Sequence, residues 1–193
     1  KIANEYLQGQ KDLSTKENLE IILTGATDAD SKVFDYLIQH KDAIIKLKSK
    51  EIFENTGIPI GIISSSWGGT RVEQWTPPEA YRESGVFSKY MTSDTSKIDG
   101  MKPGQIYKGM IQPFEGLSIR GVCWYQGESN AGRAYQYRKS FPLMISDWRS
   151  RWNDEFPFLF VQLASFNANN GNSKNGSTWA ELREAQDLTL QAL

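Results

Sequence analysis

Two short segments combine glycine with polar side chains in a way that could serve chemistry on a polar ligand. The first is Ser66–Thr70, which contains the adjacent glycines Gly68 and Gly69. Glycine lets the backbone approach a ligand closely, so a backbone N–H here could stabilise negative charge that develops on a carbonyl oxygen. Two glycines after a strand are also the ordinary composition of a tight turn, and the spacing alone leaves both interpretations open.

The second segment, Gln126–Asn130, is denser in functional groups. It places the carboxamides of Gln126 and Asn130, the carboxylate of Glu128 and the hydroxyl of Ser129 close together in the chain. Such a set could orient a base and donate hydrogen bonds to a polar ligand. The alternative is structural, because Ser129 or Asn130 could cap the helix that is expected to follow.

The single histidine and the single cysteine restrict the mechanisms open to this chain. His40 lies among alternating charges on a helical stretch, where a solvated surface histidine is expected rather than a base. Cys123 lies in an apolar run, where a thiol usually serves as a small buried hydrophobe. One cysteine also excludes an internal disulfide and a multi-thiolate metal site, and we expect no metal and no cofactor. A hydrolase with a hydroxyl nucleophile normally needs a histidine or lysine base, so that base would be His40 or a group outside this chain.

Charge and hydropathy bear on the partners. The 193 residues include 22 basic and 23 acidic side chains, for a net charge of −1. A chain with this balance lacks the positive field that would attract nucleic acid or an anionic membrane. No apolar run approaches the ~20 residues that span a bilayer. We therefore expect neither partner, and the sequence does not indicate an oligomeric state. Most of the aromatic residues are expected in the core. Those that could stack on sugar rings are Trp67, Trp75, Trp124, Tyr125 and Trp179.

Three buried strands separated by helices are expected to position the two segments. The apolar runs that predict strands are 58–63, 119–125 and 156–164, and each leads into a polar or glycine-rich loop. Such an alternation favours a parallel sheet flanked by helices, in which ligands bind beyond the carboxyl ends of the strands. The site is therefore expected in these loops.

The helices are predicted from apolar residues at three- and four-residue spacings, over 31–55, over 134–151 and from 179 to the end. Gly57 is placed to end the first of them. Residues 1–56 are rich in charge and contain no Trp, whereas residues 57–193 contain all the predicted strands. We therefore predict a divergent, charged helical segment over 1–56 and a separate folded core over 57–193.

From Gly57 to about Gln186 the sequence resembles the sialate O-acetylesterase and acetylxylan esterase-like family, a branch of the SGNH hydrolases. The matching stretches occur in family order and are 57–63, 66–70 with Glu73 and Trp75, 107–113, 121–131, 137–138, 147–149, 157–164 and 181–186. Lys108 departs from the Asn that relatives usually carry at that position. The resemblance implies a three-layer α/β/α, flavodoxin-like fold with a parallel sheet flanked by helices, here incomplete.

The resemblance also implies a function, the hydrolysis of acetyl esters on sialic acid or other sugars by a serine, a histidine and an acid. An acetylated sugar or glycan would be the partner. The residues that would bind the oxyanion or the substrate are Gly68, Gly69, Gln126, Asn130 and Trp67. Glu128 would be the acid of the triad or a support for its loop. Relatives are commonly exported, so the resemblance implies a periplasmic or extracellular parent protein.

The family's nucleophile and base motifs do not occur in this sequence. Gly9-Gln10-Lys11 and Gly104-Gln105-Ile106 are not Gly-Gln-Ser, and there is no Asp-x-x-His. We therefore expect an internal fragment of a larger esterase, with 57–193 truncated before the block that carries the histidine. The main alternative is a non-catalytic carbohydrate-binding relative. A weaker one is a glycosidase that uses two carboxylates such as Glu128 and Asp154.

Overall fold

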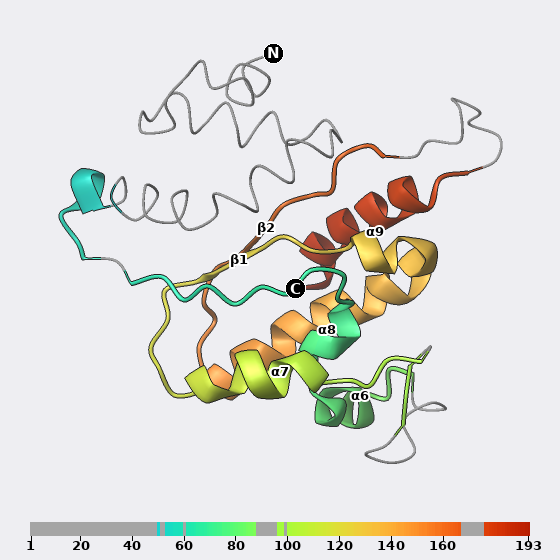
Figure 1. The fold of residues 1–193 in the computed structure, drawn as a ribbon, viewed down its shortest axis with the longest axis horizontal. Coiled ribbons are helices and arrows are strands. Elements are labelled where there is room, and N and C mark those ends of the chain that lie inside the picture. The colour runs from blue at the N-terminus through green and yellow to red at the C-terminus, as the bar shows by residue number, and fades with distance from the viewer. Residues whose placement is uncertain (1–49, 51–52, 60, 88–95, 99, 167–175) are drawn as a thin grey trace. The chain divides into compact units, whose positions relative to one another are not determined.

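The computed structural model describes residues 50, 53–59, 61–87, 96–98, 100–166 and 176–193 (Figure 1). The chain divides into two compact units, residues 1–64 with 164–166, and residues 65–163 with 167–193. Most of the first unit lies outside the described residues, as does His40. The domain boundary predicted after residue 56 therefore stays a prediction.

The helix predicted over 31–55 is visible only at its end. Residue 50 and residues 53–56 are helical, and Gly57 has a φ of +69°. The Gly57 N–H donates to the carbonyl of Phe53 at 2.7 Å, which closes the last turn. A left-handed residue at this position is how many helices end, and glycine adopts it at little cost. The predicted role of Gly57 is confirmed, and the rest of that helix lies outside the described residues.

The strand predicted over 58–63 is wrong for the residues that the structure describes there. Residues 58, 59 and 61–63 belong to no strand, and Ile58, Ile62 and Ile63 are 60%, 43% and 47% exposed. The β-branched residues favour extended backbone, but a strand also needs a hydrogen-bonded neighbour. No described residue provides that ladder.

The second unit contains the remaining elements (Figure 1). In chain order they are α5 (Val72–Trp75), α6 (Pro78–Ser84), α7 (Gln105–Met110), the 3₁₀ turn η1 (Gln112–Phe114), β1 (Val122–Trp124), the 3₁₀ turn η2 (Glu128–Arg133), α8 (Ala134–Trp152), β2 (Phe158–Phe160) and α9 (Thr178–Ala192). The two long helices confirm the predictions to within one residue. Asn153 ends α8 with a φ of +49°, and the Ser177 hydroxyl begins α9 by accepting from the Ala180 N–H at 3.3 Å.

β1 and β2 run parallel, with Val122 opposite Phe158 and Trp124 opposite Phe160, and α8 connects them (Figure 1). This β-α-β unit confirms the predicted α/β class. Successive side chains of a strand point to opposite faces, so Trp124 packs against Phe141 of α8 while Cys123 points the other way. Cys123 is exposed, and the prediction that it is buried is wrong for that reason.

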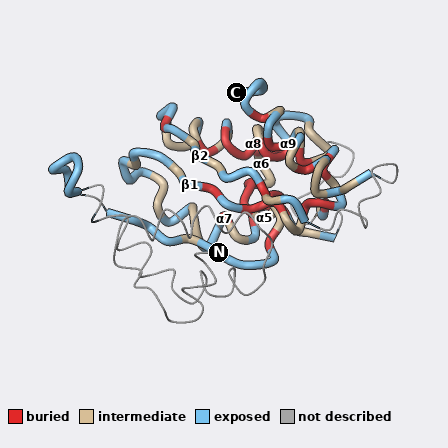
Figure 2. Tube along the Cα trace, turned by 90° about the horizontal axis from the view of Figure 1, so that it is seen from above, coloured by how far each residue is buried: buried red, intermediate tan, exposed pale blue. Residues whose placement is uncertain are grey.

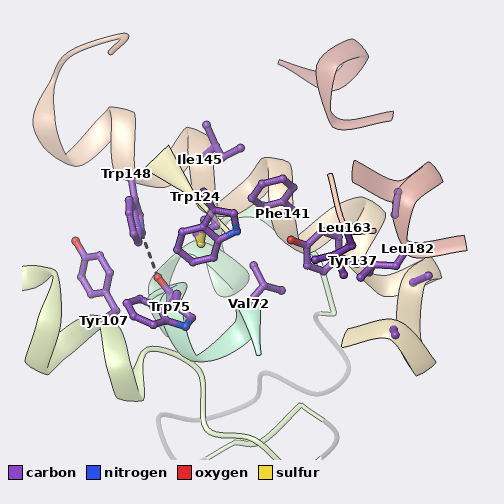
Figure 3. Close-up of a cluster of buried hydrophobic side chains, with 14 of the residues drawn as sticks. Val72, Trp75, Tyr107, Trp124, Tyr137, Phe141, Ile145, Trp148, Leu163 and Leu182 are labelled. Atoms are coloured by element: carbon purple, nitrogen blue, oxygen red, sulfur yellow. Dashed lines mark hydrogen bonds between the residues drawn. The ribbon is translucent and has the colours of Figure 1, made fainter. Parts of the chain in front are cut away.

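The core of the second unit is built around Trp124 (Figure 3). Its ring meets Trp75 edge-on at 5.5 Å and Trp148 edge-on at 5.9 Å, between ring centroids, arrangements that aromatic quadrupoles favour. The Trp148 indole donates to the Trp75 carbonyl at 3.1 Å, so the short helix α5 is bonded to α8. Buried residues concentrate in α5, α8 and α9, as Figure 2 shows.

Gly127 fixes the loop after β1 against this core. Its φ is +147°, and a Cβ at this position would lie 2.8 Å from Leu182 Cδ2 and 3.1 Å from Leu163 Cδ1. Both leucines are buried, so neither can move away freely. The loop therefore approaches α9 more closely than any other residue type would allow.

We expect Gly127→Ala to lower the free energy of unfolding by about 1–3 kcal/mol, through backbone strain and overpacking. Gly132→Ala, in the 3₁₀ turn that directly follows Gly127, is the matched control, because no heavy atom of the described residues lies within 4 Å of a Cβ there and its φ is not positive. It should change stability by about 0.5 kcal/mol or less. Urea denaturation of both variants measures the difference, and equal midpoints would contradict the packing argument.

Candidate functional site

Gly68 and Gly69 form an exposed turn that leads into α5, as the sequence predicts. Gly69 has a φ of +72°, and no atom of the described residues lies within 4 Å of a Cβ built on either glycine. Thr70 anchors the turn, because its hydroxyl donates to the Trp67 carbonyl at 2.8 Å and accepts from the Trp75 indole N–H at 2.8 Å. The turn is thus open to solvent at its tip and held at its base by the core.

Gln126 follows β1 and is directed inward. Its Nε2 donates to the Thr70 carbonyl at 3.1 Å and to Asn130 Oδ1 at 2.8 Å. Its Oε1 accepts from the Tyr137 hydroxyl at 3.1 Å. Burial raises the pKa of Tyr137 far above its usual value, so this hydroxyl stays protonated and donates. Both amide protons of Gln126 are therefore committed to acceptors within the protein.

Asn130 is fully buried and joins the turn to the loop. Its Oδ1 accepts from the Val72 N–H at 2.9 Å as well as from Gln126, and its Nδ2 donates to Glu73 Oε2 at 2.9 Å. The backbone N–H of Val72 can only donate, so it dictates which end of the carboxamide faces it. The Nδ2 group is then directed at a carboxylate, which is the stronger kind of hydrogen bond.

Glu73 carries the charge of this cluster and is also fully buried. Its Oε1 lies 3.2 Å from Nη2 of Arg133, an ion pair whose angles are not those of a direct hydrogen bond. The Glu73 carbonyl accepts from the Gly104 N–H at 3.1 Å, which ties α5 to the start of α7. A buried carboxylate without partners would be costly, so the contacts with Arg133 and Asn130 offset part of the cost of burying Glu73.

We call this connected set the Asn130 network; its members are Thr70, Glu73, Gln126, Asn130, Arg133 and Tyr137. It joins a turn, a loop, a 3₁₀ turn and two helices that are separated by as many as 67 positions in the chain, from Thr70 to Tyr137. Donors and acceptors alternate along it from the Tyr137 hydroxyl to the Glu73 carboxylate. Removing one member would leave buried partners unsatisfied, at about 1–3 kcal/mol each.

The structure brings some of the predicted site residues together and leaves others outside. Gln126 and Asn130 join the base of the Gly68–Gly69 turn within the network. Glu128 begins η2 and is half-buried, and Trp67 is 64% exposed at the turn. The capping alternative is wrong for α8, because its N-cap is Arg133 and no side chain bonds the cap.

Sequence reasoning did not assign Glu73, Arg133 or Tyr137 to the site. Glu73 stood out only as part of a stretch that matches the family. The one local signal is that the charged residue lies directly after Val72 and two positions before Trp75, so that apolar residues are close to it in the chain. Arg133 and Tyr137 carry no such signal, since their partners are distant in the chain.

Among the described residues, no group of three or more His, Cys, Asp or Glu side chains could hold a metal ion. In the same part of the chain, no helix is both long enough and apolar enough to cross a bilayer.

The chain is similar in sequence to proteins that bear the name sialate O-acetylesterase. Sialate O-acetylesterase from Homo sapiens is 32% identical over 136 residues, which cover 66% of this chain and 26% of that protein. The Mus musculus protein of the same name is 30% identical over 162 residues, which cover 66% of this chain and 30% of that protein. The chain thus spans between about a quarter and a third of the length of these relatives.

A solved structure is similar to this chain in fold as well as in sequence. The carbohydrate acetylesterase XAC1771 from Xanthomonas citri superposes with a TM-score of 0.60 and 38% identity, over 74% of this chain and 30% of that one. The chain therefore has part of the α/β fold of that enzyme, as the resemblance implied. The family described as "Carbohydrate esterase, sialic acid-specific acetylesterase" matches residues 45–192, and the chain belongs to this family.

Proposed function

We propose that the protein containing this chain is a carbohydrate O-acetylesterase, which hydrolyses acetyl esters on sugar hydroxyls. The observation that carries the proposal is the exposed Gly68–Gly69 turn, held by buried hydrogen bonds against the loop that contains Glu128. Membership of a carbohydrate esterase family supports it. The relatives that bear the names sialate O-acetylesterase and carbohydrate acetylesterase support the substrate class.

The Gly68–Gly69 turn would stabilise the oxyanion. When a nucleophilic hydroxyl attacks the acetyl carbonyl, negative charge develops on the carbonyl oxygen, and a fixed backbone N–H aimed at it lowers the barrier. The turn suits this role because its tip is free of side-chain contacts and its base is fixed by Thr70. Collapse of the tetrahedral intermediate releases the sugar, and water then releases acetate from the acyl-enzyme.

Gln126 and Asn130 would position the turn rather than donate to the oxyanion. Both Nε2 protons of Gln126 are committed to Thr70 and Asn130, and the Asn130 side chain has no exposed surface. A direct role would require breaking a buried hydrogen bond in each catalytic cycle. Their contribution is instead to keep the turn at a fixed distance from the loop, which preorganisation requires.

Glu128 would serve as the triad acid or as the support of the catalytic histidine. It lies at the start of η2, half-buried, on the loop that Gln126 and Asn130 hold. A carboxylate in this position could fix the tautomer of an imidazole and stabilise the imidazolium that forms during attack. The nucleophile and the base belong to the proposal only as the serine and histidine that the family resemblance implies.

The direct test expresses the protein with the whole of its reading frame and supplies acetylated sialic acid and acetylated xylo-oligosaccharides. We expect release of acetate from at least one of them, and loss of about 10³-fold or more in kcat on Glu128→Ala if this residue is the triad acid. Binding of glycans without release of acetate would instead favour the non-catalytic relative. Release of reducing sugar would favour a glycosidase.

The turn has a test of its own. Gly69→Ala should lower kcat by about 10²-fold, because a residue with a Cβ resists a φ of +72° and the N–H would rotate away. Gly85→Ala is the matched control, since Gly85 has the same φ of +72° and equally open surroundings at the end of α6. Both variants should lose similar stability, about 1 kcal/mol, and only the first should lose activity. Equal kcat in both would contradict the oxyanion role.

A further inference from the structure

Two large aromatic side chains stand exposed beside the candidate site. Trp67 immediately precedes the Gly68–Gly69 turn and is 64% exposed, and Tyr125 immediately precedes Gln126 and is 49% exposed. Trp75, Trp124 and Trp148, in contrast, are buried in the core. Exposing an aromatic ring forgoes the burial that the core rings obtain, so two such rings next to the candidate site suggest a ligand surface.

Two hydrogen bonds place these residues on adjoining segments. The Trp67 carbonyl accepts from the Thr70 hydroxyl at 2.8 Å, and the Thr70 carbonyl accepts from Gln126 Nε2 at 3.1 Å. Trp67 is thus bonded directly to Thr70, and Tyr125 is the chain neighbour of the residue that bonds Thr70 from the other segment. Because the Asn130 network holds these segments, the two side chains start from fixed backbone positions.

Tyr125 is further placed by its surroundings. Partial burial and the negative charge of Glu128 both raise the pKa of the Tyr125 hydroxyl, so the phenol stays neutral and lies within electrostatic reach of that carboxylate. Its neighbour along β1, Trp124, points into the core, so alternation directs Tyr125 to the other side. Tyr125 thus belongs to the same loop segment as Glu128, the candidate acid.

We propose that Trp67 and Tyr125 form an aromatic platform that binds the pyranose ring of the substrate next to the Gly68–Gly69 turn. The apolar C–H face of a sugar packs on an aromatic ring, while the Tyr125 hydroxyl can bond a sugar hydroxyl. The platform would then discriminate carbohydrate acetates from simple acetates, which have no ring to bind. This inference rests on the proposed esterase function for its catalytic readout.

The test compares two substrates in the protein expressed with its whole reading frame. In Trp67→Ala and Tyr125→Ala, kcat/KM for an acetylated sugar should fall about tenfold or more, chiefly through KM, as expected for the loss of a stacking contact. For ethyl acetate, a simple ester with no ring to stack, kcat/KM should fall much less than it does for the acetylated sugar. Trp67→Phe and Tyr125→Phe keep a ring and should retain most of the sugar activity.

Tyr135→Ala is the matched control. Tyr135 is not a member of the Asn130 network; it is 78% exposed on α8, and its ring lies 5.8 Å from the guanidinium carbon of Arg138. This variant should leave both substrates unaffected. An equal loss on both substrates in the Trp67 and Tyr125 variants, or no loss on either, would overturn the platform.

A binding measurement separates this inference from the proposed function. Calorimetric titration of the unaltered protein with the deacetylated sugar, which cannot be hydrolysed, should give heat that Trp67→Ala reduces and Tyr135→Ala does not. If no ester is hydrolysed but this pattern is seen, the esterase proposal fails and the platform stands. If esters are hydrolysed but the deacetylated sugar binds equally to all three proteins, the platform is wrong and the esterase proposal stands.

Discussion

The second unit depends on one buried carboxamide, that of Asn130. It has no exposed surface, and it bonds the start of α5, the loop after β1 and the Glu73 carboxylate at once. A side chain that must satisfy a backbone donor, an amide donor and a charged acceptor in a dry environment tolerates few arrangements of its neighbours. The positions of the turn and the loop relative to each other follow from that constraint.

The hydrophobic core and the polar network support each other. Trp75 belongs to both, because its ring packs on Trp124 while its indole N–H bonds Thr70 below the turn. Gly127 connects the loop to the core, since the absence of a side chain lets its backbone pack directly against Leu163 and Leu182. A fixed scaffold with an exposed tip is what an oxyanion site needs, because its dipoles must be oriented before the charge appears.

Much of the fold was predictable from local pattern. The ends of α8 and α9, the role of Gly57 and the β-α-β order all follow from spacing and capping chemistry that short segments contain. The run over 58–63 and the exposure of Cys123 were not predictable in this way. Both depend on which neighbours lie on a given strand edge or face, and residue composition does not encode that.

Some residues of the candidate site were likewise predictable from local sequence, and others were not. Gly68, Gly69, Gln126 and Asn130 stood out because glycine pairs and carboxamides at strand ends are unusual locally, and the structure places them together. Whether they act as proposed stays a prediction. Glu73, Arg133 and Tyr137 could not be found, since each is defined by a partner far away in the chain.

The central claim, that the contact between Glu73 and Asn130 holds the site together, is tested most directly by exchanging the two side-chain types. Asn130→Asp alone sets two buried carboxylates against each other and should lower the free energy of unfolding by about 3 kcal/mol or more. Adding Glu73→Gln restores an N–H donor opposite a carboxylate and returns the net charge to its original value. We expect the double variant to be more stable than Asn130→Asp alone, with a coupling free energy of about 1–3 kcal/mol in urea denaturation. A double variant whose loss equals the sum of the two single losses would contradict the account.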